Sequence, residues 1–172
     1  MKNSPWLAIW FYPRLSVRSA IERKSMDLAI YLAILAGIAV IFRLRMFTQI
    51  GADMPILSNL IVISLIGVIV GLVCWFVDAA IIFGIGKLLK GRARFYELLI
   101  ALGVSIFPIA SSVVICILDI FIVGEKLFAP GTLTSSWLLF SNSVTVVLTV
   151  WSLALVVCAV VEAFKHSNNE MR

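Results

Sequence analysis

Charged side chains are scarce in this sequence. Asp, Glu, Lys and Arg make up 13% of its 172 residues, whereas 62% of the residues are hydrophobic. An ordinary soluble domain contains about 25% charged residues. A soluble chain of this length could not hide so much apolar surface from water. The composition therefore excludes an ordinary soluble domain and predicts an integral membrane protein, whose first partner is the lipid bilayer.

The residues that most catalytic and metal sites require are also few. His166 is the single histidine, and the three cysteines, Cys74, Cys116 and Cys158, lie in separate apolar stretches without metal-ligand or redox spacing. No phosphate-binding loop, dinucleotide fingerprint or HExxH motif occurs. We therefore expect no enzyme, no cofactor and no metal site. The net charge of +5 does not indicate a nucleic-acid partner, because the basic residues lie at the ends of apolar runs.

Long hydrophobic runs are what the sequence has in abundance. A bilayer core about 30 Å thick requires a helix of about 20 apolar residues. Four stretches meet this requirement, at about 26–47, 56–86, 97–123 and 136–161. The predicted fold is all-α, a polytopic bundle of four transmembrane helices within 25–163, with an N-terminal segment 1–24 and a tail 164–172.

Pro108 interrupts the third apolar stretch. Proline lacks a backbone N–H and crowds the carbonyl of Val104, so we expect a kink at this point. Two short spans joined by a turn are disfavoured, because a turn inside the bilayer would leave backbone polar groups unpaired in lipid. The sequence therefore predicts one kinked helix.

Lysine and arginine gather on one side of the predicted spans. With four spans, three basic residues fall on one side, Arg43, Arg45 and Lys126. Eleven fall on the side of the two termini: Lys2, Arg14, Arg18, Arg23, Lys24, Lys87, Lys90, Arg92, Arg94, Lys165 and Arg172. The positive-inside rule then predicts a plasma (inner) membrane protein with both termini in the cytoplasm.

The segment 1–24 combines aromatic and basic residues. Its aromatic side chains are of the kind that settle at headgroup depth, and Arg14, Arg18 and Glu22 recur every four residues on one helical face. We predict an interfacial amphipathic helix on the inner leaflet; the alternative is a disordered basic tail. The candidate surface for anionic lipids or an acidic partner consists of Arg14, Arg18, Lys87, Lys90, Arg92 and Arg94.

Asp78 is a carboxylate well inside the second span. Such a residue is costly in lipid and is by default a candidate for function. It lies nine residues before Lys87, which is about 13 Å along a helix. Ser105 and Ser152 are expected at similar depth as candidate hydrogen-bond partners. The alternative is a carboxyl group that is neutral or hydrogen-bonded and serves only packing.

Asp119 lies near the opposite surface, four residues before Gly124. Arg43 and Arg45 leave the first span on that side, so an ion pair is expected there. Gly67 and Gly71 form a GxxxG pattern, which is typical of close helix packing. Their partner is either a neighbouring helix of the same chain or a second copy.

Several short motifs along the chain carry a family resemblance. The N-terminal string NSPWLAIWFYPRLSVR contains Pro-Trp, Ile-Trp and Pro-Arg in succession. Further motifs are Tyr96-Glu97-Leu98, Pro108, Gly124-Glu125 with Leu127-Phe128, and Trp151 with Glu162-Ala163. Together they resemble the Yip-domain family, the Ypt/Rab-interacting membrane proteins and their prokaryotic relatives; this chain is more similar to the prokaryotic members.

The resemblance implies an adaptor rather than an enzyme. Eukaryotic family members are adaptors that bind small GTPases and help to organise vesicle membranes, and the family has no agreed catalytic residues. Members commonly carry a fifth span after the segment that ends near Ala163, so the likeness implies a shortened relative.

The leading functional hypothesis is a non-enzymatic membrane scaffold or adaptor. Its inner surface would bind lipid or protein partners, which include another membrane protein or a second copy of the chain. The alternative is a small transporter or channel subunit, or an accessory subunit of an export system, with Asp78 in the pathway.

Overall fold

A computed structural model describes residues 13–88, 94–132 and 135–169. The regular elements of these residues are all helices: α2 (Pro13–Glu22), α3 (Met26–Thr48), α4 (Ile56–Leu88), α5 (Phe95–Ser105), α6 (Phe107–Ser111), α7 (Val113–Val123), the 3-10 helix η1 (Gly124–Phe128) and α8 (Ser136–Asn169). Four segments are long and apolar enough to cross a membrane: Met26–Thr48, Ile56–Leu88, Phe107–Phe128 and Ser136–Lys165. The predicted all-α fold with four candidate spans is confirmed.

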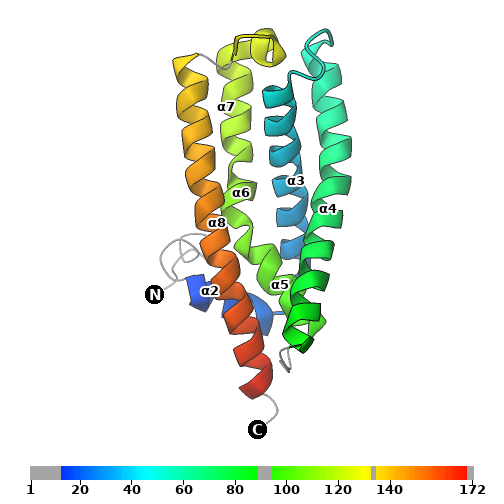
Figure 1. Ribbon diagram of the computed structural model, residues 1–172, viewed down its shortest axis with the longest axis vertical. Helices are drawn as coiled ribbons and strands as arrows, with labels where there is room; N and C mark the ends of the chain where they lie inside the picture. Colours follow the sequence, from blue (N-terminus) through cyan, green and yellow to red (C-terminus); the bar gives the residue numbers. More distant parts are fainter. Residues whose placement is uncertain (1–12, 89–93, 133–134, 170–172) are drawn as a thin grey trace.

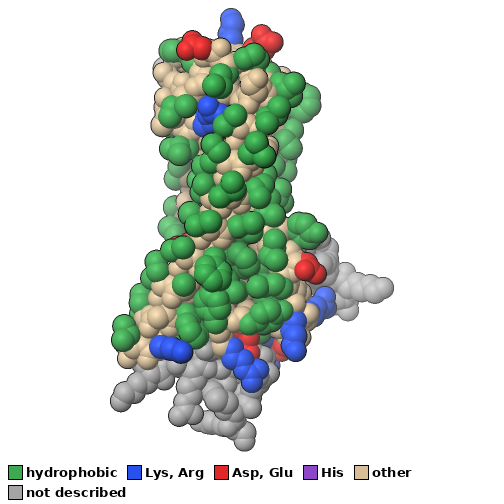
Figure 2. Space-filling model, turned by 90° about the vertical axis from the view of Figure 1, so that its right-hand side faces the viewer, with side chains coloured by type: hydrophobic (Ala, Val, Ile, Leu, Met, Phe, Trp, Pro, Cys, Tyr) green, Lys and Arg blue, Asp and Glu red, His purple; other side chains and the backbone are tan. Residues whose placement is uncertain are grey.

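The long helices lie side by side along the long axis of the molecule (Figure 1). α2 lies across the bundle at the end where α8 finishes, and η1 lies at the opposite end (Figure 1). The face seen in Figure 2 has hydrophobic side chains along its length and charged side chains towards its two ends. This distribution is the one expected of a bundle surrounded by lipid.

Local backbone chemistry explains where the helices begin and end. Pro13 opens α2, a position at which the missing N–H of proline costs nothing. α3 ends at Thr48, and the next residue, Gln49, adopts the left-handed conformation with φ of 56°. Gly124 ends α7 with φ of 65°, a conformation that a residue with a side chain rarely adopts.

The third apolar stretch is more strongly broken than the sequence predicts. The expected kink is present, but the chain divides into α5, α6 and α7, with interruptions at Ile106 and Ser112. Pro108 lies in the first turn of α6. The hydroxyls of Ser105, Ser111 and Ser112 each donate to the carbonyl three residues earlier, a pattern that bends helices. The long spanning segment therefore starts at Phe107, and α5 is a separate, shorter helix.

α5 forms the centre of the bundle half that contains α2. Every residue from Glu97 to Ser105 is buried. Its side chains pack against α2, α3, α4 and α8, and the indole Nε1 of Trp75 on α4 donates to the carbonyl of Leu99 over 3.1 Å. α5 thus fills space that four roughly parallel helices would leave open at this end.

A second apolar cluster holds the other half together. It joins α3, α4, η1 and α8 through Phe42, Met46, Ile63, Phe128 and Leu138, all of which are buried. The rings of Phe42 and Phe128 meet edge to face with their centroids 5.8 Å apart. The two main clusters thus lie one at each end of the bundle, and a smaller third cluster contains Leu32, Ala36 and Ala110.

Candidate functional site

The GxxxG residues of α4 pack against α3 of the same chain. A side-chain carbon at Gly67 would meet the backbone of Ile38, and one at Gly71 would meet the backbones of Ala33 and Gly37. Both glycines are buried. Such a close approach of two helix backbones requires residues without side chains. This face is therefore already occupied within the monomer.

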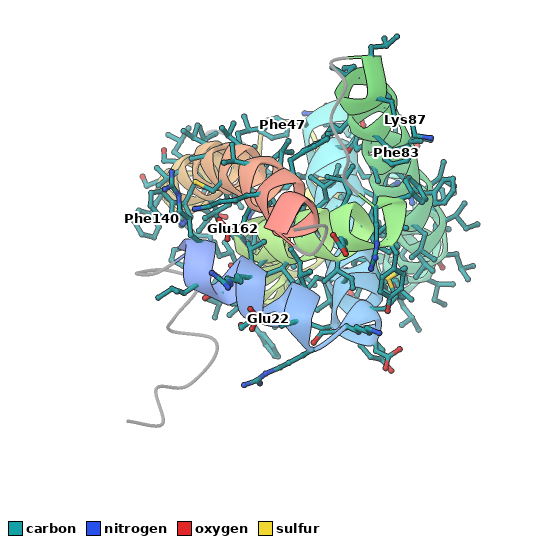
Figure 3. All side chains as sticks on the ribbon, turned by 90° about the horizontal axis from the view of Figure 1, so that it is seen from below. Glu22, Phe47, Phe83, Lys87, Phe140 and Glu162 are labelled. Carbon is teal, nitrogen blue, oxygen red and sulfur yellow. The ribbon has the colours of Figure 1, made fainter. Side chains whose placement is uncertain are left out.

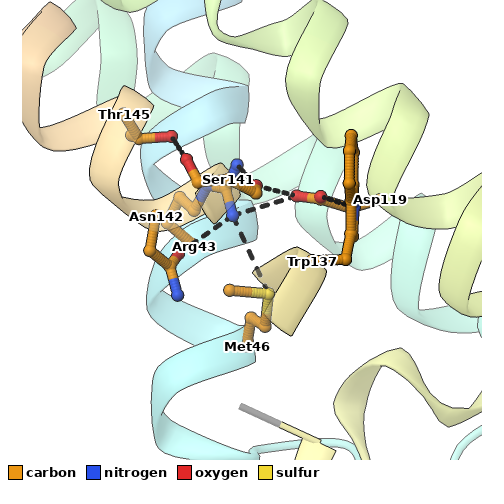
Figure 4. A network of polar contacts seen from close by, with 7 residues as sticks. All are labelled: Arg43, Met46, Asp119, Trp137, Ser141, Asn142 and Thr145. Atoms are coloured by element: carbon orange, nitrogen blue, oxygen red, sulfur yellow. Dashed lines mark hydrogen bonds and ion pairs between the residues drawn. The ribbon is translucent and has the colours of Figure 1, made fainter. Parts of the chain in front are cut away.

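Near the η1 end, a buried ion pair links α3 to α7 (Figure 4). The Nη1 atom of Arg43 lies 2.9 Å from Oδ2 of Asp119, and the Asp119 side chain is 0% exposed. The carboxylate also accepts hydrogen bonds from Nε1 of Trp137 at 2.8 Å and from Oγ of Ser141 at 2.9 Å. Arg43 donates in addition to Ser141 and to Oδ1 of Asn142. The predicted ion pair is confirmed, with Arg43 as its cation.

This network holds helices together rather than offering a reactive group. Its hydrogen bonds join α3, α7 and α8, and both charged side chains are buried and neutralise each other. Trp137, Ser141 and Asn142 were not singled out from the sequence. A carboxylate held by an arginine, a tryptophan and a hydroxyl is suited to structural pairing.

Ser105 and Ser152 meet each other instead of Asp78. The Oγ of Ser152 on α8 donates over 3.0 Å to the carbonyl of Ser105, at the break between α5 and α6. The hydroxyl of Ser105 donates to the carbonyl of Leu102. A broken helix inside a membrane needs such partners for its freed backbone carbonyls. The expectation that the two serines hydrogen-bond to Asp78 is wrong; they stabilise the kink.

Asp78 itself faces outward from the bundle. It is exposed, whereas the next residue, Ala79, is fully buried. Within residues 13–88, 94–132 and 135–169 it makes no hydrogen bond or ion pair. The structure thus places a carboxylate on the lipid-facing surface, about 13 Å along α4 from Lys87. A carboxylate at such a position is costly in lipid unless it is paired or hydrated.

Asp78 lines a groove between α4 and α8, whose floor beside Asp78 is Leu102 of α5 and Ile106 at the break between α5 and α6. One hollow of about 300 Å³ and a second of about 570 Å³ share Ile82 and Val156 and so form a continuous groove. We call it the α4–α8 groove; its lining is Trp75, Asp78, Ile81, Ile82, Ile85, Gly86, Leu102, Ile106, Leu153, Val156, Val157, Val160, Val161 and Phe164. Among the described residues that line it, Asp78 is the only charged one.

α2 lies against the bundle at the end where α8 finishes (Figures 1 and 3). Its apolar residues Val17, Ala20 and Ile21 are buried against α5 and α8, while Leu15 is 64% exposed. Arg14 and Arg18 both face solvent or headgroups. Nε of Arg18 donates to Oε1 of Glu22 over 2.9 Å, and this hydrogen bond raises the pKa of Arg18 above its ordinary value. The cation is therefore always charged.

The start of α5 and the end of α4 add further cations at this end. Nζ of Lys87 lies 4.8 Å from the centre of the Phe83 ring, and Nη1 of Arg94 lies 3.7 Å from Oε1 of Glu97. We call this region the basic end; its described exposed cations are Arg14, Arg18, Arg23, Lys24, Lys87, Arg94 and Lys165. Two further predicted residues, Lys90 and Arg92, lie outside the described residues, as do the aromatic residues before Pro13.

The opposite end differs in charge. Its exposed charged residues among those described are Asp53, Glu125 and Lys126, because Arg43 and Arg45 are buried. Burial of the two arginines makes the difference between the ends larger than the sequence count suggests. An asymmetry of exposed charge of this kind is what orients multipass proteins and attracts anionic surfaces.

Two buried carboxylates also lie at the basic end. Glu97 is 7% exposed and Glu162 is 8% exposed, and Figure 3 shows Glu162 on α8 near α2. In the described part of the chain, however, no three acidic, histidine or cysteine side chains come together as a metal site would require. Glu97 lies beside Arg94, and the charge of Glu162 acts on Arg18, so the two glutamates partly balance the surrounding cations.

The comparisons with known proteins give a family. No curated protein and no solved structure matches the chain. A family model described as the Yip1 domain matches residues 7–171, which include all four candidate spans. Because the match extends over nearly the whole sequence, this multipass membrane protein belongs to the Yip1 domain family.

Proposed function

We propose that the protein is a non-enzymatic membrane scaffold or adaptor that binds anionic lipids and protein partners through its basic end. The single observation that carries this proposal is the grouping of exposed cations, from Arg14 to Lys165, at one end of a bundle whose other end has Lys126 as its one exposed cation among the described residues. Membership of the Yip1 domain family, which is generally non-enzymatic, supports the same function.

The packing of α2 favours a helix fixed against the bundle over a mobile basic segment. Its apolar face is held by α5 and α8, so Arg14 and Arg18 keep a fixed position relative to Lys87 and Arg94. A rigid group of cations binds an anionic surface with less loss of conformational entropy than a mobile tail. In the proposed orientation this end faces the cytoplasm, where anionic lipids attract basic segments with about 1 kcal/mol per cation.

The alternative, a transporter or channel subunit with Asp78 in its pathway, receives less support. Asp78 lines an outer groove, and the nearest predicted polar residues, Ser105 and Ser152, are engaged with each other. Asp119 is paired with Arg43 at the far end. A pathway through Asp78 would therefore have to form between several chains.

Lipid-dependent stability tests the proposal on the full-length protein. We compare the wild type with the variant Arg14→Gln, Arg18→Gln, Arg92→Gln, Arg94→Gln in detergent, and measure Tm after adding phosphatidylglycerol or phosphatidylcholine. A lipid that binds the folded state raises Tm. The wild type should gain more from phosphatidylglycerol than from phosphatidylcholine, and the variant should lose most of this difference.

Lys126→Gln serves as the matched control, because it removes an exposed cation from the opposite end. It should keep the preference of the wild type. Co-purification from native membranes extends the test to protein partners, which the fourfold variant should lose. If the fourfold variant keeps both the lipid preference and the partners, the basic end is not the binding surface.

A further inference from the structure

The α4–α8 groove leaves an intramembrane charge without a partner. Asp78 is exposed there, and none of the residues that the structure describes donates a hydrogen bond to it. Carboxylates inside a bilayer persist when they pair with a cation or face water. The remaining lining is hydrophobic apart from Gly86, so the α4–α8 groove offers one charged contact on an otherwise apolar surface.

We propose that the α4–α8 groove binds a transmembrane helix of a different protein, one that carries a lysine or arginine opposite Asp78. This inference rests on the adaptor function proposed above and names the partner's chemistry in the membrane. The charge of Asp78 selects a basic residue, and the apolar lining accepts the rest of the helix.

The shape of the groove agrees with a helical partner. From Trp75 to Gly86 it follows about 16 Å of α4, which is three turns of a helix. Its floor is made by Leu102 and Ile106, and Phe164 packs against Gly86 at the basic end. A neighbouring helix would therefore contact three elements at once, with Asp78 towards the other end of the contact.

Neither a lipid chain nor the described intramembrane cations of a second copy suit Asp78. An acyl chain has no hydrogen-bond donor at this depth. In this chain Arg43 is bound to Asp119, and both Arg43 and Arg45 are buried near the η1 end. A second copy in the same orientation would place these arginines at the wrong depth for Asp78. A helix from a different protein is the occupant that satisfies the charge.

A synthetic helix tests this idea with the full chain in phosphatidylcholine liposomes. The probe is a polyleucine peptide of about 20 residues with one lysine about nine residues from its inner end. The comparison peptide has leucine throughout. Energy transfer from a donor dye on a C-terminal tag to an acceptor on the peptide reports binding. The lysine peptide should bind about tenfold more tightly than the leucine peptide.

Two variants link that preference to the groove. Asp78→Leu removes the charge, and Val156→Trp fills the hollow that both parts of the groove share. Both should bind the two peptides equally weakly. Val147→Trp is the matched control, because Val147 lies on an exposed face of α8 away from the groove, and it should keep the preference.

Three results would overturn the inference. Equal binding of both peptides to the wild type would mean that the groove accepts any apolar chain. A preference that persists in Asp78→Leu would place the site elsewhere. Energy transfer can also be measured between donor-labelled and acceptor-labelled copies of the protein. If that transfer stays unchanged with excess lysine peptide but is lost in Val156→Trp, a second copy is the occupant. Because neutral lipid is used and the arginines are intact, none of these results affects the test of the basic end.

Discussion

The guanidinium of Arg43 and the carboxylate of Asp119 form a buried ion pair 2.9 Å apart, between two helices that are far apart in the sequence. Trp137 and Ser141 supply two more hydrogen bonds to the carboxylate from α8. Because both charges are hidden from water, each depends on the other for its solvation. The pair therefore fixes the relative positions of α3, α7 and α8 at the η1 end.

Removing one member of this pair should destabilise the bundle. Asp119→Leu leaves Arg43 buried and unpaired, and should cost about 3 kcal/mol of unfolding free energy. The double variant Arg43→Leu, Asp119→Leu removes both charges and should recover most of that loss. Unfolding in mixed micelles with increasing denaturing detergent measures both values. A double variant as unstable as the single one would show that the two side chains act independently.

The α3–α4 contact should not tolerate even a methyl group. Gly71→Ala would push a carbon into the backbone of Ala33, so it should cost about 1–3 kcal/mol. Gly84→Ala is the matched control on the same helix, because nothing lies within 4 Å of its added carbon. That change should be neutral or stabilising by up to about 1 kcal/mol. Equal effects of the two substitutions would refute the close approach of α3 and α4.

The broken helix depends on a hydrogen bond from α8. Ser152→Ala removes the donor to the Ser105 carbonyl and should cost about 0.6–1.7 kcal/mol. Ser143→Ala is a suitable comparison, since the Ser143 hydroxyl donates within its own helix to Leu139. It should have little effect. The same unfolding assay measures both, and a Ser152→Ala protein as stable as the wild type would remove this role.

The proposed orientation predicts which end an impermeant reagent can reach. In a background with the three native cysteines replaced by alanine, Lys126→Cys should react with an impermeant maleimide on intact cells. Lys165→Cys should react only after the membrane is permeabilised. The reason is the excess of exposed cations around Lys165, which the positive-inside rule assigns to the cytoplasm. The opposite labelling pattern would reverse the orientation.

The sequence was sufficient to predict those features of the fold that depend on hydrophobicity and charge alone. Four apolar runs predicted four candidate spans, because about 20 apolar residues can cross the bilayer as a helix whose backbone groups are all paired internally. The Arg43–Asp119 pair could also be predicted, since two opposite charges at one membrane depth must find each other. Pro108 likewise predicted a kink in the third apolar stretch.

The rotation of a helix about its axis could not be predicted in the same way. In α4 the GxxxG pattern indicated the face that packs against α3, but the apolar residues around Asp78 gave no sign of what surrounds its side chain; the structure buries Ala79 and exposes Asp78 beside it. For this reason the sequence did not reveal that Ser105 and Ser152 hydrogen-bond away from Asp78. Their true contact depends on the break at Ile106, whose extent follows from packing around α5.

A flux assay in liposomes tests the scaffold account most directly. Purified wild-type and Asp78→Asn proteins are reconstituted and compared for movement of simple cations, protons and osmolytes, with folding checked by circular dichroism. The account predicts no flux from either protein, because Asp78 lies on the outside of the bundle as a contact for a partner. A wild-type flux that Asp78→Asn abolishes would contradict it and identify Asp78 as part of a transport pathway.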